Sequence, residues 1–268
     1  MLDFNARFGF HCTPFTREIA VAQRFSLDCF DEAFSALLRA VEQRSSAALV
    51  APAGTGKTAL LRALMARLPE ARYRVHYVKV ACLSKRDMCR EIAVVCGAEP
   101  AGSYPMLVRR LQERFVANTH TDGVRPVLIL DEAQDLRPEV LDMLRIVTNF
   151  EMDSRLVLSV LLAGQTSLRA LLRHEAHQGI AGRLAHIAGL RLLCREESQS
   201  YIAHRCTIAG AGAVPMDAGA IDGIYEIARG NLRATDQLAL KALEFAHDGK
   251  ASMVDANHVA QARRLLAP

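Results

Sequence analysis

The chain carries several short apolar runs that predict buried strands. Residues 47–51, 126–130 and 156–163 are almost entirely apolar, as is typical of strands covered on both faces of a parallel sheet. Apolar and polar residues alternate over 74–81, and we expect a strand there and a last one at 187–193. These segments together predict a parallel sheet.

Helices are predicted between these strands, because apolar residues recur there at helical spacing. Ser84 is expected to cap one of them, with Asp87 placed to complete a capping box. The alternation of strands and helices indicates an α/β fold with helices on both faces of the sheet. The segments expected to be helical are about 28–41, 57–68, 84–97, 103–118, 138–150, 166–173 and 179–184.

The strand pattern stops after Arg195, and only helical spacing follows. We therefore divide the chain into an irregular N-terminal arm at 1–28, an α/β core at 29–194 and an all-helical lid at 195–268. The lid is expected to contain four helices, at about 196–210, 217–229, 231–248 and 255–266.

Composition and charge narrow the class of protein only modestly. With 268 residues and a net charge of +4, the chain can form a large core and permits nucleic-acid binding without arguing for it. None of the seven cysteines forms a CxxC pair, which argues against structural zinc. Cys82, Cys89 and Cys96 recur every seven residues, and we interpret them as buried thiols.

No targeting or membrane segment is evident in the sequence. The first thirty residues lack the apolar region of a signal peptide, and the run at 156–164 is about half the length that spans a bilayer. We therefore expect a soluble, cytoplasmic protein without a membrane partner.

A glycine-rich segment between a predicted strand and a predicted helix carries the main chemical signal. A strand, such a turn and a helix in this order form the context of a phosphate-binding P-loop. Lys57 is expected to neutralise the β- and γ-phosphates of a bound nucleotide, and the Thr58 hydroxyl to hold Mg2+. Ala51 stands where the pattern usually has its first glycine. The residues expected to contact the nucleotide are Ala53, Gly54, Thr55, Gly56, Lys57 and Thr58.

Two carboxylates follow the predicted strand at 126–130. Asp131 is expected to hold Mg2+ with Thr58, and Glu132 to polarise the attacking water. An acidic turn after a strand is the structural alternative.

Three further polar residues are candidates for contact with the phosphates. Gln165 ends a predicted strand at the edge where a parallel sheet binds its ligand, although a turn glutamine is an equal alternative. Arg183 could act as an arginine finger toward a neighbouring subunit, or be a solvated helix residue. Arg233 begins a lid helix and could reach the phosphates, or simply start that helix.

Together these segments resemble the AAA+ ATPases of the ExeA/GspA type, a branch similar to the transposition regulators TnsC, TniB and Mu B. The resemblance implies a P-loop AAA+ core with a parallel sheet flanked by helices, and a small C-terminal all-helical lid. It also implies rings or helical filaments with ATP between subunits, Arg183 as a finger and Arg233 as a lid sensor. The segments that carry it are Phe8-Gly9-Phe10, Pro14-Phe15, Ala53 to Thr58, Asp131 to Gln134, Ala163-Gly164-Gln165 and Gly230 to Arg233.

Two roles for such an ATPase remain open. Secretion ATPases of the ExeA type carry a membrane span and a cell-wall-binding region, and this sequence shows neither. We therefore expect a transposition regulator that assembles on duplex DNA with ATP and recruits or activates a transposase. An origin-recognition or clamp-loader-like ATPase and a switch that only binds ATP are further alternatives.

Subunits of the related family present basic groups to the phosphate backbone near the start of the helix at 84–97, so the resemblance implies sequence-independent DNA contacts there. Lys85, Arg86 and Arg90 lie there, although a solvated helix start explains the same charges. A second basic cluster, Arg109, Arg110 and Arg114, is interpreted as a solvated face.

Overall fold

The computed structural model describes residues 4–266, which form two compact units. The sheet unit comprises residues 27–52 and 57–190. The helical unit comprises residues 4–26, 53–56 and 191–266. The ends of the predicted arm and lid, at 1–3 and 267–268, lie outside the described residues.

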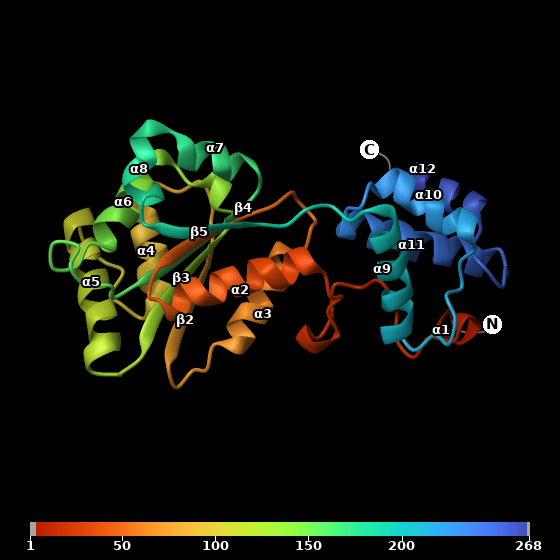
Figure 1. The fold of residues 1–268 in the computed structure, drawn as a ribbon, viewed down its shortest axis with the longest axis horizontal. Coiled ribbons are helices and arrows are strands. Elements are labelled where there is room, and N and C mark those ends of the chain that lie inside the picture. The colour runs from red at the N-terminus through yellow and green to blue at the C-terminus, as the bar shows by residue number, and fades with distance from the viewer. Residues whose placement is uncertain (1–3, 267–268) are drawn as a thin grey trace. The chain divides into compact units, whose positions relative to one another are not determined.

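A parallel sheet forms the centre of the sheet unit (Figure 1). Among the described residues its strand order is β2-β3-β4-β1-β5, and every neighbouring pair is parallel. Strands β1 and β4 are adjacent although most of the sheet unit separates them in sequence. The strand bounds are β1 Ser46–Val50, β2 Tyr73–Lys79, β3 Arg125–Asp131, β4 Ser159–Gly164 and β5 Leu184–Gly189.

The central strands are buried on both faces, as their apolar runs predict. In β3, Val127 and Ile129 face one helical layer, while Leu128 and Leu130 face the other. The first layer consists of α2 (Asp28–Glu42) and α3 (Lys57–Arg67). The opposite layer consists of α4 (Lys85–Cys96), α5 (Tyr104–His120), α6 (Pro138–Val147), α7 (Ser167–Arg173) and α8 (Gln178–Ala181).

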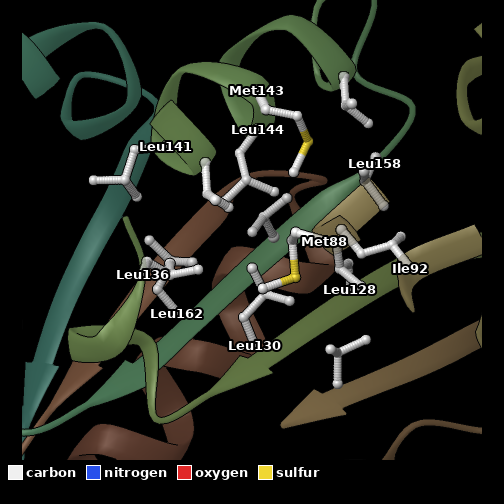
Figure 2. Packing of buried hydrophobic residues seen from close by; sticks show 14 of the residues in the cluster. Met88, Ile92, Leu128, Leu130, Leu136, Leu141, Met143, Leu144, Leu158 and Leu162 are labelled. Carbon is white, nitrogen blue, oxygen red and sulfur yellow. The ribbon is translucent and has the colours of Figure 1, made fainter. Parts of the chain in front are cut away.

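Figure 2 shows the packing beneath the second layer. Met88 and Ile92 of α4 and Met143 of α6 lie over Leu128 and Leu130 of the sheet. These side chains are fully buried, so this layer is fixed to the sheet by close apolar packing.

Helix α4 begins after the predicted cap, Ser84, but the Asp87 carboxylate contacts the Ser84 hydroxyl and not its backbone amide, so the expected capping box is not formed. The Ser84 hydroxyl accepts a hydrogen bond from the Asp87 amide, and Gly97 ends the helix in the left-handed conformation at φ 67°. Ser84 Oγ also donates to Asp87 Oδ2 at 2.6 Å. The capped first turn fixes where Lys85 and Arg86 leave the helix.

Several sequence expectations are wrong in detail. The run from Leu156 is buried at Val157 and Leu158, but β4 begins only at Ser159. Strand β5 is earlier than expected, at Leu184–Gly189, and the expected helix at 179–184 is the short α8. The last strand alternates in exposure because it lies at an edge of the sheet.

The cysteine interpretation holds for two of the three residues at seven-residue spacing. Cys89 and Cys96 are buried in α4, and burial raises the pKa of both thiols to about 12. Cys82 precedes the helix and is exposed, so it is not a core residue.

The helical unit has its own apolar core, which includes part of the N-terminal arm. The arm is not wholly irregular: it contains α1 (Phe4–Phe8) and the 3-10 turn η1 (Val21–Gln23). Phe8, Phe10 and Phe15 are buried against the C-terminal helices. Those helices are α9 (Arg195–Ile208), α10 (Ala218–Ala228), α11 (Leu232–Asp248) and α12 (Ala256–Leu266).

A buried polar network ties the arm to these helices. The Arg205 side chain is 3% exposed and donates to Asp236 Oδ2 at 3.0 Å and to the Thr16 carbonyl at 2.7 Å. Tyr201 Oη accepts from Arg205 and donates to Asp236 Oδ1, both at 2.9 Å. Burial raises the pKa of Asp236 to about 6, while the Arg205 charge acts in the opposite direction.

Replacing Arg205 with Met is expected to destabilise the helical unit by about 3–5 kcal/mol. The change leaves the Asp236 carboxylate buried without its cation and removes the hydrogen bond to Thr16. Urea unfolding followed by circular dichroism measures the loss. The double variant Arg205→Met/Asp236→Leu should recover part of it, because no charge then remains buried.

The control is Arg109→Met, which removes an exposed pair with Glu113. It should cost less than about 1 kcal/mol. A loss from Arg205→Met no larger than the control's would show that the buried network contributes nothing.

No helix among residues 4–266 is long and apolar enough to cross a membrane.

Candidate nucleotide site

The loop between β1 and α3 has the backbone that close approach to a phosphate requires. Gly54 and Gly56 have φ of 76° and 96°, a region that only glycine enters at little cost. Ala51 is buried, and its φ is not positive, so alanine is accommodated there without strain. Its amide donates to the Gly164 carbonyl at 3.1 Å, which ties the start of the loop to the end of β4.

Lys57 is held against the beginning of the same loop. Its Nζ donates to the carbonyls of Ala51 and Pro52 at 3.2 and 3.1 Å, and the residue is only 7% exposed. A buried ammonium at the first residue of α3 places positive charge where amides of the helix N-terminus already favour an anion.

Thr58 and Asp131 come together although they are far apart in sequence. Thr58 Oγ1 lies 3.5 Å from Asp131 Oδ2, which is long for a hydrogen bond. Asp131 is the last residue of β3 and is 3% exposed. A hydroxyl and a carboxylate offer only oxygen atoms, the donor type that Mg2+ prefers, so this pair fits the ion.

Tyr77 of β2 also contacts the Asp131 carboxylate. Its hydroxyl donates to Asp131 Oδ2 at 2.9 Å, while the Glu132 amide donates to Oδ1 at the same distance. Burial, and then the nearby Asp131, raises the pKa of Tyr77 to about 12, so it stays a neutral donor. Both oxygens of Asp131 are thereby oriented by the protein.

Glu132 follows directly in a left-handed backbone conformation, with φ 58° and ψ 37°. Such a conformation is costly for a residue with a side chain, and it turns the chain sharply at the end of β3. Glu132 Oε2 accepts from Gln134 Nε2 at 3.0 Å. Glu132 is half-buried, so its side chain is partly open to solvent.

Gln165 lies one residue beyond β4, at the same edge of the sheet as the loop after β1 and Asp131. Its amide donates to Gln134 Oε1 at 2.9 Å. Within the sheet unit, the structure thus brings Lys57, Thr58, Asp131, Glu132 and Gln165 to one edge.

Arg183 is not part of that group. It precedes β5 and so lies at the amino ends of the parallel strands, opposite the carboxyl ends where the other residues lie. Its guanidinium donates to both carboxylate oxygens of Asp153 at 2.6 and 2.7 Å. It also donates to Thr148 Oγ1 at 3.0 Å. The side chain is 23% exposed. Within one subunit, therefore, Arg183 fixes the turn that follows α6.

In the helical unit, residues 53–56 of the loop contact the start of α11. Asn231 Nδ2 donates to the Ala53 carbonyl at 2.7 Å, and the Arg233 amide donates to the Gly54 carbonyl at 3.2 Å. A Cβ atom on Gly54 would overlap the Asn231 side chain. The Arg233 side chain is exposed.

The basic residues at the start of α4 are partly engaged with their neighbours. Lys85 Nζ lies 5.0 Å from the centre of the Tyr104 ring, and Arg86 donates to the Gly102 carbonyl at 3.0 Å. Arg90 pairs with Asp87 at 3.2 Å. Lys85 and Arg86 are exposed and could meet a phosphate backbone.

Sequence reasoning assigned no role to three residues of this region: Tyr77, Gln134 and Asn231. Gln134 and Asn231 lie inside segments that were singled out as motifs, and the N-cap position of Asn231 was a usable signal. Tyr77 gave no signal beyond its place in an alternating strand.

Comparison with known proteins identifies the family. A family model described as AAA domain matches residues 39–172, half of the chain. The general secretion pathway protein A of Aeromonas hydrophila is 28% identical over 200 residues, which cover 73% of this chain. The chain spans only 36% of the length of that relative.

Solved structures agree with the fold. The ORC1 protein of Aeropyrum pernix in complex with DNA matches with a TM-score of 0.71 at 19% identity, covering 94% of this chain and 68% of that chain. The Thermotoga maritima RuvB Holliday junction branch migration motor matches with a TM-score of 0.63 at 19% identity, covering 92% and 74%. The predicted parallel sheet flanked by helices, with helices after it, is confirmed. The chain therefore belongs to the AAA domain family and is an ATPase.

Proposed function

We propose that the loop after β1 and the carboxylates after β3 bind and hydrolyse ATP with Mg2+. The contact between Thr58 and Asp131 supports this assignment, because it pairs two oxygen donors, one of which is next in sequence to the buried Lys57. Mg2+ held by this pair would neutralise charge on the phosphates. Lys57 adds positive charge there, and Glu132 accepts a proton from the attacking water.

Gln165 is assigned to the γ-phosphate or the attacking water, because it lies at the same sheet edge as Glu132. Arg233 is assigned to the phosphates, since its own amide contacts the Gly54 carbonyl. Arg183 lies away from this edge, so its role as a finger requires a neighbouring subunit. Assembly into a ring or helical filament would supply that neighbour.

We also propose that the ATP-bound assembly binds duplex DNA. It would act there as a transposition regulator that recruits or activates a transposase. The exposed Lys85 and Arg86 support sequence-independent contact with phosphates. The similar structures of an ORC1 protein in complex with DNA and of a Holliday junction branch migration motor support a DNA-related role. A secretion-associated ATPase without DNA binding is the second candidate, favoured by the similarity to general secretion pathway protein A.

Duplex-DNA binding at fixed salt separates these two functions. The full chain is mixed with random-sequence duplex and ATP, ADP or no nucleotide, and binding is followed by fluorescence anisotropy. Tight binding only with ATP supports the DNA role. Absence of binding in all three states, with ATP turnover intact, favours the secretion role.

Replacing Lys85 and Arg86 together with Ala should weaken this DNA binding and lower the slope of log affinity against log salt by about 2. Two phosphate contacts are then lost, whichever sequence is bound. The control is Arg109→Ala, which removes an exposed arginine paired with Glu113 and should leave the slope unchanged. An unaltered slope in the double variant would place the DNA site elsewhere.

A further inference from the structure

The Gln134 side-chain amide donates to two carboxylates and accepts from the residue that follows a strand. Its Nε2 donates to Glu132 Oε2 at 3.0 Å and to Asp135 Oδ2 at 3.2 Å. Its Oε1 accepts from the Gln165 amide at 2.9 Å. One side chain therefore joins the residue after β3 to the residue after β4.

The orientation of this amide is determined by its partners. A carboxylate can only accept from Gln134, and a backbone amide can only donate to it. A flipped amide would set its oxygen against Glu132 and Asp135 and its nitrogen against the Gln165 amide. Gln134 therefore has a single satisfactory orientation here, in a side chain that is otherwise free to rotate.

Gly164 provides the space that this contact needs. A Cβ atom on Gly164 would lie 2.9 Å from Gln134 Oε1 and 3.0 Å from the Gln134 backbone nitrogen. The φ of Gly164 is not positive, so glycine serves close approach here and not an unusual backbone conformation. The end of β4 is thus shaped to receive the Gln134 amide.

Glu132 needs such a restraint. It occupies a left-handed conformation, and its carboxylate is reached through three rotatable bonds. A base that must meet one water molecule loses much of its effect when it is displaced by about 1 Å.

We propose that Gln134 is a positioning residue that fixes the Glu132 carboxylate relative to Gln165. The proposal rests on the assignment of Glu132 as the group that accepts the water proton. Through Gln134, any shift of the end of β4 on contact with nucleotide also moves the Glu132 carboxylate. The Gln134 side-chain amide would then couple recognition of the γ-phosphate or the attacking water by Gln165 to activation of that water by Glu132.

The first test is Gln134→Met, which keeps the length of the side chain but removes its donor and acceptor. We expect kcat for ATP hydrolysis to fall by about 10- to 100-fold, with ATP affinity within about twofold of the unaltered chain. Without nucleotide, hydrogen exchange at the Gln165 amide should increase by about fivefold or more.

A matched control exists in the same unit. Gln112 Nε2 donates to the carbonyls of Ile146 and Asn149 at 3.0 and 3.1 Å, so it also bridges two segments through one amide. Gln112→Met should leave kcat and exchange at Gln165 unchanged. An equal fall in kcat in both variants would show that lost bridging, and not the position of Glu132, is responsible.

Gln134→Glu separates the contact with Glu132 from the contact with the Gln165 amide. It retains an oxygen to accept from the Gln165 amide but removes the donor and brings negative charge toward Glu132. We expect slow exchange at Gln165 to persist while kcat falls at least as far as in Gln134→Met. This variant also tests the proposal if Gln134→Met does not fold.

A double-mutant cycle with Glu132→Gln tests whether Gln134 acts through Glu132. If Gln134 acts through Glu132, adding Gln134→Met to Glu132→Gln should change the residual rate by less than about twofold. Independent, multiplying effects would overturn the proposal, as would normal kcat in Gln134→Met when Glu132→Gln is stalled. Normal turnover in Glu132→Gln itself would instead refute the proposed role of Glu132.

Discussion

Replacing Lys57 with Ala should abolish ATP hydrolysis, with a fall in turnover of about 1,000-fold or more. The lysine is 7% exposed and is fixed by two carbonyls at the start of the loop, so its loss removes a positive charge that is held in one position. The loss should include most of the ATP affinity. Steady-state turnover and titration with a fluorescent ATP analogue measure both effects.

Arg67→Ala is the matched control for Lys57→Ala. Arg67 is an exposed cation in the last turn of the same helix, α3, and its loss should leave turnover within about twofold. Unchanged turnover in Lys57→Ala would refute the assignment of the loop between β1 and α3 to the phosphates.

Replacing Glu132 with Gln should stop hydrolysis while ATP remains bound. The amide keeps the shape of the side chain and an oxygen that accepts from Gln134, but it cannot take a proton from water. We expect single-turnover hydrolysis to slow by about 100-fold or more, within the range of a lost general base. Because ATP persists, the assembled state should also persist, which light scattering after size-exclusion chromatography can measure.

Glu113→Gln serves as the control for that experiment. Glu113 is an exposed carboxylate of α5 that pairs with Arg109, and its change should alter neither hydrolysis nor assembly. Hydrolysis at the normal rate in Glu132→Gln would remove Glu132 from the reaction. Stalled hydrolysis without a more persistent assembly would separate catalysis from assembly.

The sequence predicts the centre of the sheet well and its margins less well. Strand β3 is buried along nearly its whole length, and its apolar run correctly predicts a strand that is covered on both faces. Near β4, Val157 and Leu158 are equally apolar and buried but precede the strand, because burial alone does not distinguish a strand from the coil that enters it. At β5, Leu190 and Leu193 are buried after the strand has ended, which moved the expected strand toward them.

The candidate site shows a similar division. Lys57 and Asp131 could be identified because each lies in a short local motif. Lys57 follows a glycine loop, and Asp131 follows an apolar run. The contacts of Gln134 with Gln165, of Tyr77 with Asp131 and of Asn231 with Ala53 could not be predicted, since they join residues 31, 54 and 178 positions apart in the chain. Hydrophobic periodicity describes faces of elements, but it contains no information on which polar side chain meets which distant backbone group.

The N-terminal arm has a consequence for how the protein is made. Phe8, Phe10 and Phe15 are synthesised well before the helices that bury them, which begin only at Arg195. The hydrogen bond from Arg205 to Thr16 spans 189 positions, so this contact of the helical unit cannot form until residue 205 has been synthesised. The sheet unit is complete by residue 190 and is able to fold earlier. During that interval these three phenylalanines have no core to enter, and exposed apolar side chains of this kind make a folding intermediate prone to aggregate.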